Sequence, residues 1–412
     1  MIKYIDLCSG IGGFRVALES MDNIESKCVL SADIKQDAID TYNLNFNENN
    51  KVTDIYNLKN EDIESFDLLC AGFPCQPFSS AGQKKGFSDK RGGMIFKIID
   101  ICKYHKPSFV LLENVYNLMA LENGNCIKKI KQLFEDIGYM VNFKKLNSCD
   151  FGCPQSRERV YIVCTKDKIF DFENINYKEN VNLSTIIDYS NNKTNLNPEF
   201  CEKILELHKE SPIFGCKIGD KRGGKNNIHS WDIGFNGKLN KDEKELINKI
   251  MLNRRKKHWA EKKKIVWMDG MPLTYEEITT FYKHNDLKKM LDNLVALKYL
   301  RLEKPKDLVD GKRVYKEELP EGYNICKGKL SFPISKILDP NDISPTLTAT
   351  DSHKLAVIIN DSIIRNISSM EMKKICGFPD SFLIPEHVNY GDLFGNMATP
   401  PVIKEIFEIL LR

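Results

Sequence analysis

The sequence predicts an α/β fold in which helices cover both faces of a sheet and a smaller domain is inserted into the chain. Through the first 165 residues, short apolar runs alternate with segments that carry apolar residues at helical spacing. The alternation is lost from Lys166 to about Ser331, where Asn, Lys, Gly and charged residues cluster, and it returns afterwards. We therefore expect one domain made of residues 1–165 and 331–412, interrupted by a second domain over residues 166–330.

The elements of the first domain follow from these runs in chain order. The expected strands are Lys3–Leu7, Cys28–Ala32, Phe66–Ala71, Phe109–Leu112, Val160–Cys164 and, in the return segment, Leu355–Ile359. The expected helices are Phe14–Met21, Ala38–Phe46, Met94–Tyr104, Ile127–Ile137 and, near the C-terminus, Val402–Leu411.

The insert shows three helical segments followed by a turn signal. The helices are expected at Lys241–Lys257, Leu273–Phe281 and Asp286–Tyr299. Strand-like Leu300–Leu302 and the Asp-Gly turn before Lys312–Tyr315 indicate a hairpin. Three helices and a hairpin over residues 239–316 match a winged helix with a basic reading surface, and a generic helical insertion accounts for the pattern equally well.

Composition narrows the class of protein. The chain is 42% hydrophobic and 28% charged over 412 residues, so it can build a sizeable core. No apolar run reaches the ~20 residues of a membrane span and no signal peptide is visible, so we expect a cytoplasmic protein without a membrane partner. The 13 cysteines fit neither a disulfide framework nor zinc spacing, which predicts reduced thiols and no metal.

Positive charge gathers in the middle of the chain. Residues 201–340 hold about 30 Lys and Arg against about 21 Asp and Glu, while the formal charge of the whole chain is only +3. The middle of the chain is therefore the part expected to face a polyanion.

A glycine-rich turn follows the first expected strand in "DLCSGIGGF", residues 6–14. Glycines let the backbone approach a ligand, and the next helix offers free N–H groups, although a tight turn alone also explains them. Asp33 follows the second strand, where a carboxylate can accept from ribose hydroxyls, and Asp54-Ile55 precedes the third. This spacing suits a nucleoside cofactor but lacks the GxGxxG dinucleotide fingerprint.

One thiol, one acid and two arginines stand at strand ends. Cys75 lies between two prolines in "CAGFPCQPFSS", just after a strand, where α/β sheets place their active sites. A nucleophilic thiol needs nearby positive charge, which Arg157 and Arg159 on one face of "QSRERVYIV" can supply. Glu113 closes the strand in "SFVLLENV", and burial there would help it donate a proton. A single site explains all four residues.

These motifs together resemble those of the DNA cytosine-5 methyltransferases of bacterial and phage restriction-modification systems. "DLCSGIGGF" is similar to their cofactor loop, "GFPCQPFS" to the nucleophile loop, "ENV" to the catalytic acid, and "QSRERVYIV" to the paired arginines. "SPTLTA" and "YGDLFGNMATPP" are similar to the last two motifs, in the same order and spacing. The resemblance covers residues 1–165 and 330–412, and it implies a Rossmann-like S-adenosylmethionine-dependent methyltransferase fold whose insert is the variable target-recognition domain.

The resemblance implies a covalent mechanism on cytosine in double-stranded DNA. The Cys75 thiolate would add to C6, so that C5 becomes nucleophilic enough to take the methyl group, and the flanking prolines would fix the loop. Glu113 would hold or protonate the N3 edge, Arg159 would contact the O2 edge, and Arg157 would help orient the base and the Cys75 loop. Because C6 is hidden in the stacked duplex, the base would be flipped out.

The resemblance also implies which residues bind S-adenosylmethionine and DNA. Asp33 would bind the ribose, Ile34 and Ile55 the faces of the adenine, Asp54 its amino group, and Asn396 the methionine end. The cofactor set also includes Asp6, Gly10 and Gly12 of the loop and Gly72 beside the nucleophile. In the basic insert, DNA contacts are expected from Arg222, Lys225, Arg254, Arg255, Lys256 and Lys257, the last four more with phosphates than with bases.

The chain departs from the family pattern at three positions. Cys8 stands where a phenylalanine is usual, Met397 replaces a serine, and Asn341 replaces an arginine. None of them removes a catalytic group, so we expect altered binding rather than lost activity.

Three other functions fit part of the pattern. A tRNA cytosine-5 methyltransferase would share nearly the same site but would lack the large basic insert. A silent DNA-binding regulator would not need all of Cys75, Glu113, Arg157 and Arg159, and an NAD-linked oxidoreductase leaves the Pro-Cys-Gln segment unexplained. We expect a monomer in the bacterial cytosol or nucleoid that protects DNA against a cognate nuclease. The recognized DNA sequence is not readable from these residues.

Overall fold

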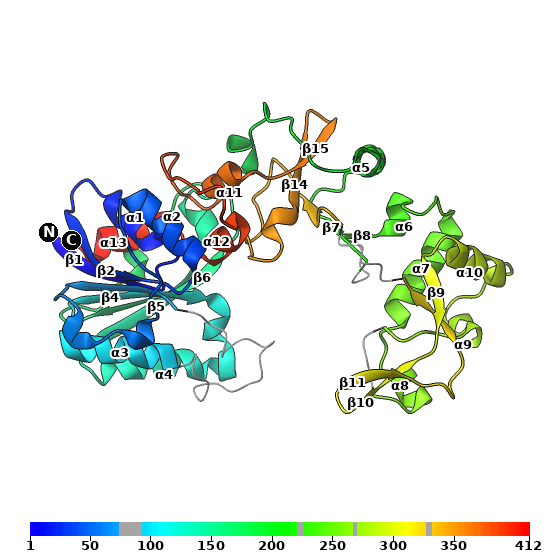
Figure 1. Cartoon of the computed structure of the whole chain (residues 1–412), viewed down its shortest axis with the longest axis horizontal. Coiled ribbons are helices and arrows are strands. Elements are labelled where there is room, and N and C mark those ends of the chain that lie inside the picture. The colour runs from blue at the N-terminus through cyan, green and yellow to red at the C-terminus, as the bar shows by residue number, and fades with distance from the viewer. Residues whose placement is uncertain (74–92, 221–225, 267–269, 327–331) are drawn as a thin grey trace. The chain divides into compact units, whose positions relative to one another are not determined.

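The computed structural model describes residues 1–73, 93–220, 226–266, 270–326 and 332–412. The chain divides into two compact units (Figure 1). The first unit holds Met1–Asp188, Asp339–His353 and Ile367–Arg412, and the second holds Tyr189–Leu338 and Lys354–Asn366. The second unit thus begins after residue 188, rather than near 166, and it also includes Lys354–Asn366 of the return segment.

A six-stranded sheet organises the first unit. Its strands are β1 (Ile2–Leu7), β2 (Ser26–Ala32), β3 (Leu68–Gly72), β4 (Phe109–Val115), β5 (Met140–Asn147) and β6 (Glu158–Thr165). The order across the sheet is β2-β1-β3-β4-β6-β5, with parallel pairing from β2 to β4 and antiparallel pairing of β6 with both neighbours. The carboxyl ends of β1, β3 and β4 therefore lie at one edge, where the N-terminal end of β6 joins them.

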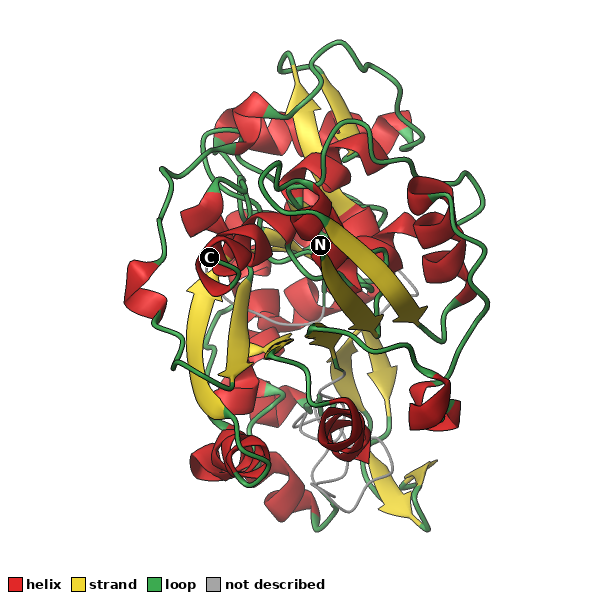
Figure 2. Ribbon diagram, turned by 90° about the vertical axis from the view of Figure 1, so that its left-hand side faces the viewer, coloured by secondary structure: helices red, strands yellow, loops and turns green. Residues whose placement is uncertain are grey.

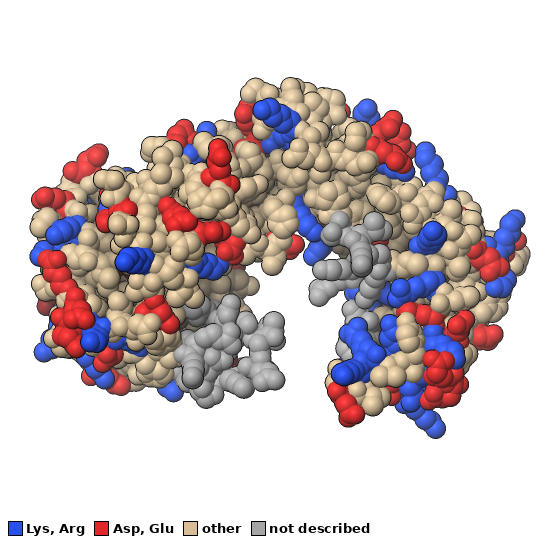
Figure 3. Space-filling view, viewed as in Figure 1, with Lys and Arg blue, Asp and Glu red and all other residues tan. Residues whose placement is uncertain are grey.

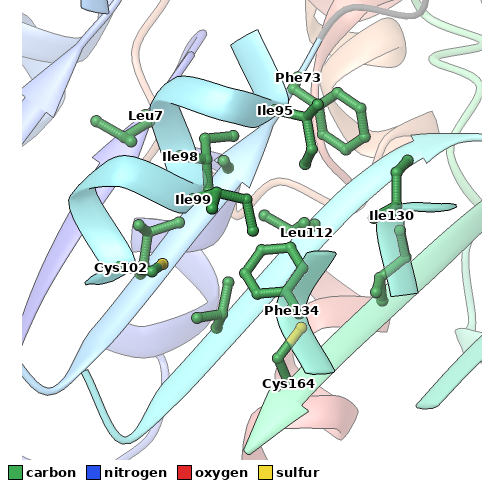
Figure 4. Packing of buried hydrophobic residues seen from close by; sticks show 14 of the residues in the cluster. Leu7, Phe73, Ile95, Ile98, Ile99, Cys102, Leu112, Ile130, Phe134 and Cys164 are labelled. Atoms are coloured by element: carbon green, nitrogen blue, oxygen red, sulfur yellow. The ribbon is translucent and has the colours of Figure 1, made fainter. Parts of the chain in front are cut away.

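Helices cover both faces of this sheet because alternate strand residues are apolar on each face. On one face, α3 (Gly93–His105) and α4 (Asn125–Glu135) bury their apolar sides with residues such as Leu69 and Leu112. Figure 4 shows Ile98 and Phe134 packed near Leu112. On the other face, α1 (Gly13–Glu19) and α13 (Pro400–Leu410) pack on residues such as Leu68. Helix α2 (Gln36–Phe46) follows β2, and Figures 1 and 2 show helices on both sides.

The return segment is tied to the sheet next to β6. Ser344 pairs with Gln155 in an isolated bridge, and the Ser156 amide donates to the Ser344 carbonyl at 2.8 Å. Helices α11 (Ser369–Ile375) and α12 (Tyr390–Asn396) follow before the chain returns in α13. The last segment passes so close to α1 that a Cβ at Gly13 would lie 2.1 Å from the Ala398 carbonyl oxygen.

The second unit contains two separate cores, one of them around a five-stranded sheet. The order is β15-β14-β13-β7-β8, and α5 (Pro198–Glu210) packs on it through Phe200 and Ile204. The strands are β7 (Lys217–Ile218), β8 (Asn227–Ile228), β13 (Lys336–Ile337), β14 (Leu355–Ile359) and β15 (Ile363–Asn366). The sequence indicated that Leu355–Ile359 completes the first domain, and this was wrong. β14 pairs antiparallel with β15 and parallel with β13, which places it in this sheet.

The other core is formed entirely by residues 231–325, so this segment is a contiguous module. Its helices are α6 (Ser230–Ile233), α7 (Lys241–Asn253), α8 (His258–Lys263), α9 (Tyr275–Thr279) and α10 (Leu287–Ala296). Its strands are β9 (Leu300–Glu303), β10 (Lys306–Val309), β11 (Lys312–Tyr315) and β12 (Gly322–Ile325). The expected hairpin would have paired residues 300–302 with Lys312–Tyr315. In the structure, β11 pairs instead with β10 across the Asp-Gly turn, and β9 pairs with β12.

No helix in the described part of the chain has the length and apolar character that a membrane crossing requires.

Candidate active site

Three predicted site segments meet at the carboxyl edge of the main sheet. Gly72 ends β3 and pairs with Glu113 of β4. A Cβ built at Gly72 would lie 3.7 Å from the Cys8 carbonyl oxygen and 3.9 Å from Glu113 Oε2. The end of β3 therefore stands between the glycine-rich loop after β1 and the predicted catalytic acid.

Glu113 and Arg159 form a shielded ion pair. Arg159 Nε lies 2.9 Å from Glu113 Oε1, and both side chains are about nine-tenths buried, at 11% and 10% exposed. Antiparallel pairing of β4 with β6 places Arg159 opposite Val115, two residues beyond Glu113, so the pair is a diagonal contact. Burial raises the pKa of Glu113, and the positive charges of Arg159 and Arg157 oppose this only in part. A carboxyl in this setting keeps its proton at higher pH than a free glutamate.

The residue after Glu113 fixes the entrance to the predicted nucleophile loop. Asn114 is buried, and its side-chain amide donates to the Phe73 carbonyl at 2.9 Å. Phe73 is the last described residue before Pro74, and Cys75 lies outside the described residues. Asn114 was not among the predicted site residues, although a polar residue in a buried strand was a usable signal.

Arg157 binds the return segment. The residue is 2% exposed, and its guanidinium donates to the carbonyl oxygens of Leu347, Gly395 and Met397 at 3.3, 3.2 and 2.6 Å. Burial, followed by the charge of Arg159, lowers the pKa of Arg157 to about 10. These contacts join two of the motif segments to β6, and a role toward the base or the Cys75 loop stays a prediction.

The loop after β1 is held in the conformation that its glycines permit. Cys8, Gly10 and Gly12 have φ values of 53°, 53° and 86°, in the left-handed region. Asp33 accepts from the Gly10 amide through Oδ2 and from the Lys35 amide through Oδ1, both at 2.9 Å. Asp33 is half-buried, so each carboxylate oxygen keeps a lone pair for a ribose hydroxyl. The loop and its acid thus fit a nucleoside cofactor.

The remaining predicted cofactor residues differ in exposure. Ile34 is 66% exposed, whereas Ile55 is 2% exposed and belongs to the sheet core. Asp54 is exposed and accepts from the Tyr56 amide at 3.0 Å. Asp6 is fully buried beneath the loop, and among the described atoms neither of its carboxylate oxygens has a hydrogen-bond partner. Burial raises the pKa of Asp6 well above its usual range.

Asn396 is connected to the Asp33 segment through a polar chain that the sequence did not reveal. Its side-chain amide donates to Asp392 Oδ1 at 2.8 Å, and Lys35 Nζ lies 2.6 Å from Asp392 Oδ2. Lys35 follows Asp33 by two residues, so this contact places the first turn of α12 near the Asp33 segment.

The predicted DNA contacts of the insert need one correction. Arg254 is fully buried and donates to Asn324 Oδ1 at 2.5 Å, so it cannot face DNA. Its side chain fills the space beside Gly270 and binds β12 within the module core. Arg255 is partly exposed, Lys256 and Lys257 are exposed, and Arg222 and Lys225 lie outside the described residues.

Comparisons with known proteins relate the whole chain to one family. Residues 2–412 match the family model for C-5 cytosine-specific DNA methylases. The chain is 42% identical to Type II methyltransferase M.NlaIV of Neisseria lactamica, over all of this chain and 99% of the relative. It is 34% identical to Type II methyltransferase M.BanI of Aneurinibacillus aneurinilyticus, over all of this chain and 96% of the relative.

Solved structures share the fold. The methyltransferase EhMeth of Entamoeba histolytica aligns with a TM-score of 0.55 at 17% identity, covering all of this chain and 98% of that one. The fold is thus the predicted Rossmann-like methyltransferase fold, and S-adenosylmethionine is the methyl donor. With the family model matched over nearly its whole length, this chain belongs to the C-5 cytosine-specific DNA methylases.

Proposed function

We propose that this enzyme methylates one cytosine within a specific duplex sequence through a covalent bond from Cys75, and that it is the modification enzyme of a restriction-modification system. The observation that carries the mechanism is the buried Glu113–Arg159 pair beside Gly72 and the glycine-rich loop. It supplies a proton donor and a cation next to the start of the Cys75 loop. S-adenosylmethionine supplies an electrophilic methyl group when it is bound at that loop.

The protein residues act on the cytosine ring. The Cys75 thiolate adds to C6, and the electron pair released from the C5–C6 bond is shared between C5 and the N3–O2 edge. Glu113, whose pKa is raised by burial, gives or shares its proton at N3, and Arg159 stabilises charge at O2 while holding Glu113 in place. C5 then takes the methyl group, whose bond to the donor sulfur breaks. Loss of the C5 proton to a base expels the thiolate, and return of the N3 proton to Glu113 restores the ring.

The ring must leave the helix for this chemistry. Flipping a base costs roughly a few kcal/mol, which phosphate contacts from a basic surface can offset. Exposed Lys256 and Lys257 of the second unit, with Arg222 and Lys225, are the proposed source of such contacts.

The biological context is proposed from the relatives, which are named Type II methyltransferases. By analogy with these relatives, we propose a monomeric cytosolic enzyme that marks DNA against a partner nuclease. Purified enzyme should protect its methylated DNA from an endonuclease encoded beside it, and a locus without such a gene would contradict this part of the proposal.

The decisive experiment follows labelled methyl transfer from S-adenosylmethionine to duplex DNA, with tRNA in parallel. Cys75→Ser should abolish transfer to DNA, while Cys201→Ser on α5, a partly exposed cysteine far in sequence from the site motifs, should leave it unchanged. Sequencing the product would then identify the target. Label on tRNA alone, or full activity of Cys75→Ser, would refute the proposed reaction.

A further inference from the structure

The β10–β11 ribbon of the second unit is the least packed regular element of the contiguous module. None of its residues belongs to the module core formed by residues 231–325. All four residues of β11 are exposed, and Leu308 and Tyr315 are 44% and 47% exposed. An isolated two-stranded hairpin is marginally stable in water, so exposure on both faces calls for an explanation.

The ribbon nevertheless has a defined attachment and turn. Asp307 accepts from the backbone amides of Val266 and Leu308, and the Lys316 amide donates to the Pro305 carbonyl at 2.9 Å. Asp310 and Gly311, with φ values of 48° and 76°, close the tip as a tight turn. The ribbon is therefore a fixed projection rather than a frayed segment.

One face of the ribbon combines cationic and amphipathic side chains. Lys306 pairs with Tyr315, and Leu308 pairs with Arg313, so alternation places these four residues on the same face. Lys306 Nζ lies 4.4 Å from the centre of the Tyr315 ring, which orders both side chains. Figure 3 shows Lys and Arg together with Asp and Glu near this end of the second unit.

Apart from the short helix α8, the order of elements around the ribbon is that of a winged helix. Helices α7 and α8 are followed by a bridge between Leu273 and Tyr323, then by α9 and α10 and the β9–β12 pair, and in the sequence the ribbon lies between those two strands. The exposed side of α10 adds Lys288 and Lys289. A two-stranded ribbon has dimensions that a major groove admits.

We propose that the β10–β11 ribbon enters a groove of the DNA duplex, with Arg313 and Lys306 contacting the DNA. This inference rests on the proposed action on duplex DNA and names the surface that positions the duplex. Charge complementarity decides the occupant: the face offers two cations, one leucine and one tyrosine, without a carboxylate. The Arg313 fork can bind a guanine edge or a phosphate, and Lys306 acts as a point charge.

The test measures binding and catalysis separately on a fluorescent duplex that carries the site found by product sequencing. Arg313→Ala should weaken binding of this duplex at least tenfold, while kcat at saturating DNA stays within twofold of wild type. Arg313→Lys should restore part of the affinity if the contact is with phosphate, and little if it is a bidentate base contact. Lys128→Ala, an exposed lysine of α4, removes the same charge from the first unit and should bind like wild type.

The outcomes separate this inference from the proposed function. Binding of Arg313→Ala within twofold of wild type, or a loss of kcat at unchanged affinity, would overturn the role of the ribbon. A wild-type enzyme that transfers no methyl to DNA would instead refute the proposed function. Because Arg313 is exposed, the thermal unfolding midpoint of Arg313→Ala should equal that of Lys128→Ala, which shows that a loss of affinity is not a loss of fold.

Discussion

Glu113 is an acid whose protonation is set by two opposing effects. Burial favours its neutral form, and the guanidinium 2.9 Å away favours its carboxylate. The net effect raises its pKa, so the proton is held at higher pH than in the unfolded chain. Stability linked to this residue is therefore present at low pH and is lost as the pH rises through the raised pKa.

We predict that Glu113→Gln lowers kcat by roughly 10²- to 10⁴-fold, as is usual for the loss of general acid catalysis. In wild type, kcat should fall as the pH rises through the raised pKa of Glu113, because the proton is lost. The glutamine cannot ionise, so the residual activity should lack this decline. Glu158→Gln is the matched control, since Glu158 forms a surface pair with Lys145. An unchanged decline in Glu113→Gln would show that another group titrates.

We predict that Arg157 stabilises the structure around the site by holding the return segment against β6. Lysine cannot reach three carbonyl groups with a planar fork, and each unsatisfied buried carbonyl costs about 1–3 kcal/mol. Arg157→Lys should therefore lower the thermal unfolding midpoint and raise the KM for S-adenosylmethionine, because Asn396 lies between two of the bound residues. A variant with normal stability and cofactor KM but reduced kcat would support orientation of the base instead.

Among the elements, the contact of α1 with the segment before α13 is possible only because Gly13 has no side chain. A Cβ at Gly13 would overlap the Ala398 backbone carbonyl at 2.1 Å, and backbone cannot give way as a side chain can. Gly13→Ala should destabilise the enzyme by about 1–3 kcal/mol, measured by urea unfolding. Gly93→Ala at the start of α3 is the control, since its nearest neighbour would be 3.5 Å away. Equal stability of both variants would contradict this packing.

The strands show what sequence patterns can and cannot predict. Runs such as Phe109–Leu112 were found because central strands are buried on both faces and consist of apolar residues. β5 was missed because this edge strand is only partly buried and carries Lys144 and Lys145. Leu355–Ile359 was correctly expected to be a strand but assigned to the wrong unit, since an apolar run does not identify its pairing partner.

At the candidate site, the sequence indicated which residues share an edge of the sheet but not which contacts they make. The types and order of Glu113 and Arg159 indicated a shared edge, and the structure pairs them. A run of basic residues suggested that Arg254 is solvated, yet its partner Asn324 lies 70 residues later and no local pattern reveals it. Long-range polar contacts of this kind depend on packing between elements, which periodicity does not encode.

At the scale of the whole molecule, positive charge is concentrated in the middle of the chain. Residues 201–340 carry the excess of Lys and Arg, while the complete chain has a formal charge of only +3. DNA binding should therefore respond to salt far more than cofactor binding does, because phosphate contacts release counterions. The predicted cofactor site instead centres on the Asp33 carboxylate, which accepts short, partly buried hydrogen bonds from the backbone amides of Gly10 and Lys35.

We predict that raising salt from about 50 to about 200 mM weakens duplex binding by roughly 10³-fold if about six phosphates are contacted, and changes cofactor affinity less than about twofold. Replacing exposed Lys256 and Lys257 with alanine should reduce the slope of log affinity against log salt by about one unit per lost contact. Arg254→Ala should instead unfold the module, since it removes a buried partner of Asn324. If the slope of log affinity against log salt is unchanged in the double variant, the phosphate contacts lie elsewhere on the second unit.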